Sequence, residues 1–232
     1  MLNVQPKEES EGRRGRQSSG RARLIVGLAL PSILVVVAAG HCLGRLGENF
    51  HVVIPGCVYR SGQLSSESLA ERAARESICS VINLRGANPG QTWYDQECAV
   101  TRRQDLRFYD LPVDSQCPTA LELRELLDVL ERCPKPVLIH CQSGIDRSGI
   151  VAAICILLLD ESGSIERARA HLGWRYGHMP WRDNMSVQER FLEDYHKWLT
   201  DHGQGHDRGH FRDWLVLISK HGDALSASRT NP

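Results

Sequence analysis

The residues best suited to chemistry lie in one short segment, from His140 to Gly149. Five residues separate Cys141 from Arg147, and Ser148 follows the arginine directly. A Cys thiolate is a strong nucleophile, and an Arg guanidinium can donate two charge-assisted hydrogen bonds to two oxygens of one phosphate group. This pairing and spacing predict attack of the Cys141 sulfur on a phosphate ester that Arg147 holds.

The elements on either side of this segment place it at a strand-to-helix turn. The short apolar run Val137–His140 predicts a buried strand, and the run from Gly149 to Leu159, apolar on every side, predicts a central buried helix. A loop in that position points successive backbone N–H groups into its own centre, and the helix dipole favours an anion there. The same field is expected to stabilise a thiolate, and the Ser148 hydroxyl is expected to bond the sulfur and help it leave later. The predicted phosphate-binding loop comprises Gln142, Ser143, Gly144, Ile145, Asp146 and Arg147.

Strands and helices alternate along the rest of the chain. A hairpin is expected from His51–Ile54 and residues 58–60 around Pro55-Gly56, and Thr119 with Glu122 predicts a capping box. Further strands are expected at 79–84 and 108–113, and further helices at 66–77, 92–104, from 119 to about 133, 164–171 and 186–199. This order predicts an α/β fold with a mostly parallel central sheet flanked by helices.

The signature His-Cys-x5-Arg-Ser-Gly resembles that of the Cys-dependent protein tyrosine and dual-specificity phosphatases. The segments Val58–Gln63 (VYRSGQ) and Val81–Arg85 (VINLR) are similar to the opening segments of the bacterial and fungal dual-specificity-like branch. The resemblance covers roughly residues 48–200. It implies the protein tyrosine phosphatase-like fold and a two-step reaction through a phosphocysteine, with no cofactor and no metal.

The resemblance also implies a general acid, usually an Asp on a loop before the Cys. Asp110 and Asp114 lie in such a region, and Asp114 is expected to be more loop-like because Pro112 and Pro118 flank it. An Asp directly before the Arg, like Asp146, resembles the myotubularin lipid phosphatases and a mycobacterial secreted phosphatase. Asp114 and Asp146 remain equal candidates, and Asp110 ranks below both.

Three further residues have weaker roles in this interpretation. His140 is expected to orient the loop through hydrogen bonds. Arg85, at the end of a predicted strand, either contacts the substrate or forms a structural ion pair. Arg60 is expected to be structural, and Trp174, Trp181 and Trp198 are expected in the core.

The main functional hypothesis is a protein-tyrosine or dual-specificity phosphatase acting on a phosphorylated protein. The first alternative is a membrane-proximal phosphatase of a phospholipid, although no Lys lies between Cys141 and Arg147 to help bind a highly phosphorylated headgroup. The second alternative, from a different class, is a phosphate-binding module without catalysis, which the presence of Cys141, Arg147 and Ser148 disfavours.

The first part of the chain differs in character from the rest. Residues 1–23 carry six basic and three acidic groups and predict a disordered basic tail, and residues 24–43 predict a transmembrane signal anchor or a signal peptide. The basic residues precede the apolar run, which predicts an extracytoplasmic catalytic domain, periplasmic in a bacterium. Residues 48–223 are expected to form the phosphatase domain, and residues 224–232 a flexible tail.

The overall composition excludes several other classes. Lys plus Arg and Asp plus Glu both number 28, and a zero net charge argues against a nucleic-acid partner. The eight Cys form no CxxC pair, and the His residues make no zinc-binding spacing, so no metal site is expected.

Overall fold

The structure, a computed structural model, describes residues 48–114, 118–177 and 187–228. Within them, a five-stranded sheet has the order β1-β2-β5-β3-β4. Only β1 is antiparallel, as one arm of the predicted hairpin, and the other neighbours pair in parallel. The strands are β1 (His51–Ile54), β2 (Val58–Ser61), β3 (Ser80–Asn83), β4 (Arg107–Asp110) and β5 (Val137–His140). The predicted α/β class with a mostly parallel sheet is confirmed.

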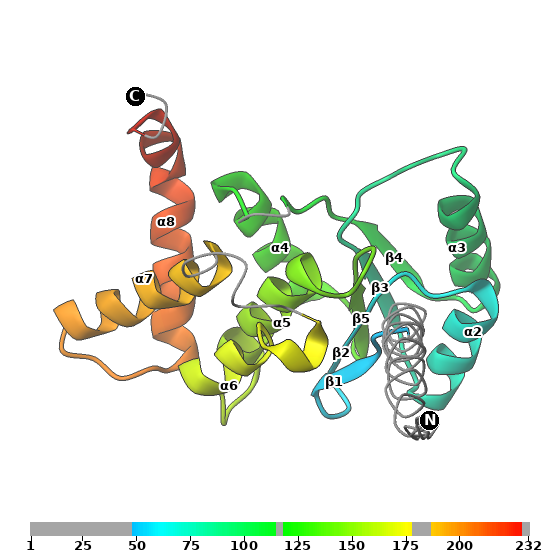
Figure 1. Cartoon of the computed structure of the whole chain (residues 1–232), viewed down its shortest axis with the longest axis horizontal. Coiled ribbons are helices and arrows are strands. Elements are labelled where there is room, and N and C mark those ends of the chain that lie inside the picture. Colours follow the sequence, from blue (N-terminus) through cyan, green and yellow to red (C-terminus); the bar gives the residue numbers. More distant parts are fainter. Residues whose placement is uncertain (1–47, 115–117, 178–186, 229–232) are drawn as a thin grey trace, which may run out of the picture. The chain divides into compact units, whose positions relative to one another are not determined.

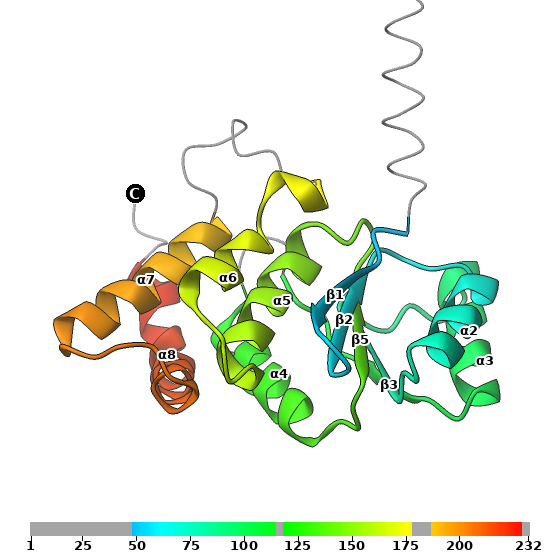
Figure 2. The same cartoon turned by 90° about the horizontal axis from the view of Figure 1, so that it is seen from below.

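Helices cover both faces of the sheet, as Figures 1 and 2 show. Helices α2 and α3 lie on one face, and α4 and α5 lie on the other, with α6, α7 and α8 beyond them. The helices are α2 (Ser66–Arg75), α3 (Thr92–Arg103), α4 (Ala120–Arg132), α5 (Asp146–Leu159), α6 (Ile165–Ala170), α7 (Val187–Asp201) and α8 (Arg208–Ser228), with a 3₁₀ turn at Trp174–Tyr176.

Two hydrophobic clusters explain why the central strand is apolar throughout. Val137 and Ile139 of β5 pack into the cluster with α4 and α5, whereas Leu138 packs into the cluster with α2 and α3. Successive side chains of a strand point to opposite faces, so a strand covered on both sides has no polar face. The short apolar run of β5 is the sequence signature of that burial.

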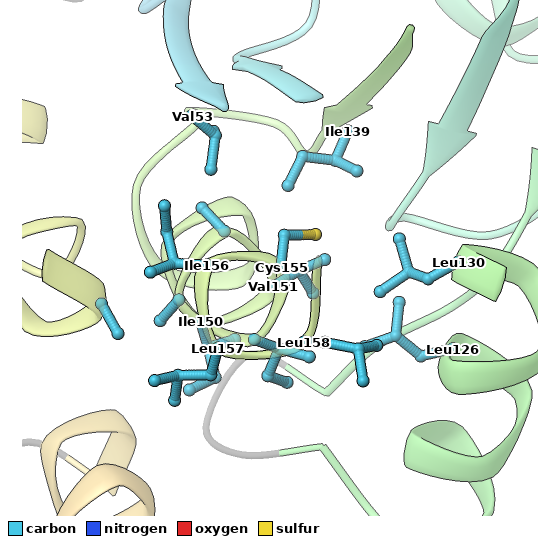
Figure 3. Close-up of a cluster of buried hydrophobic side chains, with 14 of the residues drawn as sticks. Val53, Leu126, Leu130, Ile139, Ile150, Val151, Cys155, Ile156, Leu157 and Leu158 are labelled. Atoms are coloured by element: carbon cyan, nitrogen blue, oxygen red, sulfur yellow. The ribbon is translucent and has the colours of Figure 1, made fainter. Parts of the chain in front are cut away.

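Helix α5 is the centre of the larger cluster. Figure 3 looks along this helix and shows its side chains extending in several directions, with Val53 and Ile139 on the sheet side and Leu126 and Leu130 of α4 on another. Every residue of α5 from Ser148 to Leu158 is buried. Because this helix is held from several sides, its N-terminus is a rigid platform for the loop that precedes it.

The register of the parallel strands brings three strand ends together. His140, the last residue of β5, pairs with Ser61 of β2 on one side and with Asn83 of β3 on the other. The carboxyl ends of parallel strands form the edge where open α/β sheets bind ligands. Cys141 is therefore the first residue beyond that edge, at the middle of the sheet.

The capping signals in the sequence also have their expected structural effect. Thr119 and Glu122 form both bonds of a capping box at the start of α4. Ser164 caps α6 by accepting a hydrogen bond from the backbone N–H of Arg167. These bonds satisfy helix N–H groups that would otherwise have no intrahelical partner.

Helix α8 is the main element that the sequence analysis does not predict. Its buried residues Phe211, Trp214 and Leu215 pack in the larger cluster, and the rings of Phe191 and Trp214 lie 5.0 Å apart. The helix extends to Ser228, beyond residue 224 where the flexible tail was expected to begin. Gly, His and Asp residues before and within α8 interrupt the apolar pattern of this helix in the sequence. Its apolar face is recognised only from the residues that pack against it.

The expectation for the three tryptophans is wrong at one position. Trp174 is 79% exposed. Trp198 is partly buried against the larger cluster, whereas Trp181 lies outside the described residues. Trp174 belongs to a short 3₁₀ turn, and none of the residues of that turn is buried.

The predicted tail at 1–23 and the predicted membrane segment at 24–43 lie outside the described residues. Among the helices that the structure describes, none combines the length and the apolar character needed to cross a bilayer. The membrane segment and the orientation derived from it stay predictions.

Candidate active site

Cys141 is the first residue of the loop between β5 and α5. Its side chain is almost fully buried, and the backbone N–H of Gly144 donates to its Sγ at a distance of 3.2 Å. No side chain caps α5, whose N-cap residue is Ile145. Backbone N–H groups at a helix N-terminus and the helix dipole both favour negative charge at this place.

Arg147 lies in the first turn of α5 and is anchored from the neighbouring strand. Its Nη1 donates to the carbonyl oxygen of Leu84, just after β3, at 3.2 Å. The backbone of Leu84 in turn donates to the carbonyl of His140 at 2.9 Å. The structure thus brings Cys141 and Arg147 to the same loop, with donors left on the guanidinium for a phosphate group.

Two buried or half-buried side chains hold the loop from outside. Nη2 of Arg60 donates to the carbonyls of Gly144 and Ile145 at 2.7 and 3.1 Å, and Nη1 donates to the carbonyl of His171 at 2.7 Å. Asn49 donates to the carbonyls of Ser143 and Gly144, both at 3.0 Å. When hydrogen bonds hold the loop carbonyls toward the outside, the N–H groups of the same peptides point toward the centre of the loop.

Arg60 belongs to a buried strand and is itself fully buried. Its guanidinium also lies 4.2 Å from the centre of the Tyr176 ring, which adds a cation–π contact. Burial lowers the pKa of Arg60 to about 10, so the side chain still carries its charge near neutral pH. The sequence analysis assigned Arg60 a structural role and overlooked Asn49. A charged residue within an otherwise buried strand is the signal that singles out Arg60.

Gly144 shows how closely the loop approaches β2. Its φ is +72°, and a Cβ atom there would lie 2.6 Å from the nitrogen of Gly62 and 2.8 Å from the carbonyl carbon of Ser61. Both neighbours are backbone atoms, so no side-chain rotation can relieve the contact. Glycine is required at this position for its conformation and for its size.

The variant Gly144→Ala is expected to lower the free energy of unfolding by roughly 2–4 kcal/mol, from left-handed strain and overpacking together. Gly90→Ala is the matched control, because Gly90 has a φ of +84° but a Cβ atom at that position would have no neighbour within 4 Å. The control should lose only about 1–2 kcal/mol. Urea unfolding compares the two, and equal losses would contradict the close approach.

Ser148 is buried, and its hydroxyl donates to the carbonyl of Ser61 at 3.2 Å. The hydroxyl lies one residue from Arg147 at the start of α5, where a rotation would be needed to bring it to the sulfur. Its predicted role as a donor to Sγ stays a prediction. The observed bond gives it a second role, which is to join the loop to β2.

His140 lies at the end of β5, with its Nε2 atom 2.9 Å from Oε1 of Glu97 in α3. Both side chains are almost fully buried. Both ring nitrogens of His140 and Oε2 of Glu97 are buried and make no hydrogen bond of good geometry in the described part of the chain. The pair lies between α3 and the strand that leads to Cys141, and the expected role of His140 in orienting the loop through hydrogen bonds stays a prediction. Sequence reasoning missed Glu97.

The three candidate acids differ in their surroundings. Both carboxylate oxygens of Asp110 are bound, by Asn83 at 2.9 Å and by the hydroxyl of Tyr94 at 2.5 Å, which fits a structural role. Asp114 is exposed at the end of a described stretch, and its backbone N–H donates to Glu122 at 3.1 Å. Asp146 is exposed in the first turn of α5. The choice between Asp114 and Asp146 therefore stays open.

His171 lies behind the loop and is nearly buried. Its ring stacks on Tyr176, and its Nδ1 lies 3.4 Å from Nη1 of Arg60. Burial, followed by the charge of Arg60, lowers the pKa of His171 to about 4. The ring is therefore neutral in the folded protein over a pH range in which it is charged in the unfolded chain.

This difference predicts a loss of stability in acid. The folded state binds fewer protons than the unfolded state between pH 6.5 and about 4, so stability falls as pH falls through that range. Between pH 7 and 5 the expected loss from His171 is about 2 kcal/mol. His171→Phe keeps the ring stack and should show a smaller loss in urea unfolding. The prediction fails if wild type and variant lose equal stability.

Several comparisons with known proteins bear on this site. Residues 94–165, which include Cys141 and Arg147, match the model of a tyrosine phosphatase family. The resemblance to the Cys-dependent phosphatases is confirmed. The matched segment of this phosphatase family runs from α3 to the start of α6, so it spans β5, the loop and α5. No curated protein matches the chain.

A solved phosphatase structure shares the fold. The core catalytic domain of the PP-IP phosphatase SIW14 from S. cerevisiae matches with a TM-score of 0.51 and 20% identity, over 67% of this chain and 93% of that one. TpbA from P. aeruginosa matches with a TM-score of 0.47 and 20% identity, over 74% and 91%. A putative phosphatase from Shewanella putrefaciens CN-32 matches with a TM-score of 0.47 and 18% identity, over 67% and 97%.

The sequence predicts no metal site. In the described residues, no group of three or more His, Cys, Asp or Glu side chains is arranged to hold a metal ion.

Proposed function

We propose that the chain is a phosphomonoester hydrolase that works through a phosphocysteine on Cys141, and that its substrates are phosphotyrosine and other phosphorylated residues of proteins. One observation carries the proposal. The Sγ atom of Cys141 accepts a hydrogen bond from the backbone N–H of Gly144 in its own loop. The loop leads into the N-terminus of α5, which no side chain caps, and Arg147 lies in the first turn of that helix. The proposed nucleophile and the groups that would bind a phosphate therefore belong to one short loop and the helix that follows it.

The reaction follows from this arrangement in two steps. The Cys141 thiolate attacks phosphorus, the bond from phosphorus to the ester oxygen breaks, and a general acid protonates the departing oxygen. The loop N–H groups and Arg147 stabilise the charge on the equatorial oxygens. Water then attacks phosphorus, the acid now acts as base, and the phosphorus–sulfur bond breaks to release phosphate and the thiolate.

The identity of the acid is tested with two leaving groups. The Asn variant of the true acid, Asp114→Asn or Asp146→Asn, should lose roughly 10²–10⁴-fold in kcat on phenyl phosphate. Its loss on para-nitrophenyl phosphate should be much smaller, because nitrophenolate needs little protonation to leave. Asp110→Asn is the control and should show no such dependence on the leaving group. An equal loss on both substrates excludes the residue as the acid.

Phosphate release from para-nitrophenyl phosphate tests the hydrolase itself. Wild type should release phosphate continuously, and rapid denaturation during turnover should leave one phosphoryl group on the peptide that contains Cys141. Phosphate binding without release would instead support a non-catalytic binding module and overturn the proposal.

A substrate panel then distinguishes protein from lipid. Phosphotyrosine, phosphoserine and phosphothreonine peptides are compared with phosphatidylglycerophosphate in mixed vesicles. The absence of Lys between Cys141 and Arg147 favours the peptides. The membrane segment predicted at 24–43 is compatible with a phosphoprotein or a lipid at the bilayer, so it does not distinguish the two. A higher kcat/KM for the lipid would replace the protein substrate by the lipid alternative.

A further inference from the structure

Arg85 lies directly beside the phosphate loop. It follows Leu84, whose carbonyl accepts the hydrogen bond from Arg147. Its Nη1 donates to Oε1 of Gln63 at 3.0 Å, and the backbone N–H of Gln63 donates to the carbonyl of Gln142 in the loop at 3.1 Å. Arg85 is thus connected to both ends of the loop, through Leu84 on one side and Gln63 on the other.

The guanidinium of Arg85 is held in one orientation. Its central carbon lies 3.4 Å from the centre of the Trp93 ring, so the ring supports one face of the group. Trp93 belongs to α3 and is half-buried, as is Arg85. Stacking together with the bond to Gln63 lowers the entropy that the side chain would lose on binding a ligand.

The positive charge of Arg85 is not neutralised by these contacts. In the residues that the structure describes, its recorded partners are a neutral amide and an aromatic ring. The acid in its neighbourhood, Glu97, lies against His140. Burial and the charge of Arg147 lower the pKa of Arg85, which indicates that the two cations are close. An anion shared by two such cations relieves their repulsion.

The side-chain amide of Gln63 is a second donor, next to the guanidinium of Arg85. Its Nε2 atom is buried and has no hydrogen-bond partner among the described residues. A buried donor without a partner destabilises the fold, and an acceptor on a ligand would remove that cost. The guanidinium of Arg85 contacts Oε1 of the same amide group, so Nε2 lies close to it.

We propose that Arg85 and the Nε2 atom of Gln63 form an anion subsite that binds a second acidic group of the substrate, next to the phosphate held by the loop and Arg147. The inference rests on the proposed hydrolase and specifies its substrate class, which is a phosphomonoester with a neighbouring carboxylate or second phosphate. It also assigns Arg85 to substrate binding, so the alternative of a structural ion pair is set aside.

The selectivity between a charged and a neutral substrate measures this subsite. Wild type is expected to prefer 3-carboxyphenyl phosphate over 3-carbamoylphenyl phosphate by about 10-fold in kcat/KM, as one charge-assisted hydrogen bond provides. Arg85→Met and Gln63→Leu should bring this ratio close to one, whatever they do to the rate itself. The control Arg103→Met removes the same charge from an exposed position on α3 and should keep the wild-type ratio.

Binding to the Cys141→Ser protein gives a readout that does not depend on turnover. Pyrophosphate should bind about 10-fold more tightly than orthophosphate, and Arg85→Met in the same background should remove most of that advantage. If wild type hydrolyses aryl phosphates but Arg85→Met keeps both ratios, the subsite is refuted and the hydrolase stands. If no aryl phosphate is hydrolysed while the pyrophosphate advantage depends on Arg85, the hydrolase is refuted and the anion subsite stands. A carboxylate preference without a pyrophosphate preference identifies a carboxylate as the second group, and the reverse identifies a phosphate.

Discussion

Cys141→Ser is expected to lower kcat for para-nitrophenyl phosphate by roughly 10⁴–10⁶-fold, the scale of loss when an enzyme's nucleophile is removed. A serine hydroxyl has a far higher pKa than a thiol, so it is a far weaker nucleophile toward phosphorus at neutral pH. The sulfur accepts an N–H bond from Gly144, and a serine oxygen can accept the same bond. The variant should therefore keep the fold and still bind orthophosphate.

Cys79→Ser is the matched control for this experiment. Cys79 is half-buried just before β3, and its thiol donates to the carbonyl of Ser77 at 3.5 Å, a bond that serine can make. The control should retain wild-type kcat within about two-fold, because conservative surface changes cost little. Phosphate release is measured for both variants and wild type. Comparable losses in both, or substantial activity of Cys141→Ser, would remove Cys141 from the chemical step.

Arg60→Met is expected to lower both stability and activity by large amounts. The change removes three hydrogen bonds from a charged donor, to the carbonyls of Gly144, Ile145 and His171. Asn49 still donates to Gly144 and the N–H of Gly149 still donates to Ile145. A hydrogen bond from a charged group contributes roughly 1.5–3 kcal/mol, so the free energy of unfolding should fall by about 3 kcal/mol or more. The loop peptides would also turn, and a misplacement of about 1 Å in a catalytic group costs on the order of 10²-fold in rate.

The control for Arg60→Met is Arg72→Met. Arg72 also lies over an aromatic ring, 4.3 Å from the centre of Phe50, and it pairs with Glu48 at 2.9 Å, but it makes no bond to the loop. It should lose stability by about 1 kcal/mol and keep its kcat. Urea unfolding, kcat and the inhibition constant of orthophosphate are measured for each variant.

A positioning role for Arg60 has its own signature. Arg60→Met should weaken orthophosphate inhibition and lower kcat in the population that remains folded, whereas a purely structural loss would change only the folded fraction. Arg60→Lys should restore part of the affinity, because an ammonium group can still bond one carbonyl. Unchanged orthophosphate inhibition in Arg60→Met would show that the loop does not need this support.

The parts of the site that could be predicted from sequence are local along the chain. Val137 to Gly149 contains a strand, a loop and the start of a helix, and each has its own local signal: an apolar run, a five-residue spacing and a second apolar run. The structure places β5, the loop and α5 there, with β5 beginning and ending at the predicted residues. Thr119 and Glu122 are likewise close in sequence, so their capping box was predictable.

The rest of the site depends on contacts between distant residues. Arg60 reaches Gly144 across 84 positions, and Asn49 reaches it across 95. Such pairings carry no spacing signal in a single chain. Helix α8 was missed for the same reason, because its apolar residues become recognisable only against Phe191 and Tyr195 of α7.

Taken by itself, the sequence determined the strand–loop–helix and the residues proposed there as nucleophile and phosphate-binding arginine, because one short run of consecutive residues, Val137 to Gly149, contains all of them. It also determined the α/β class, since alternating apolar runs leave few other ways to bury them. The tertiary structure alone decided what keeps the loop in shape and what borders it. Arg60 and Asn49 bind the loop carbonyls, and Arg85 stacks on Trp93 beside Gln63, because the parallel register ends β2, β3 and β5 at one edge.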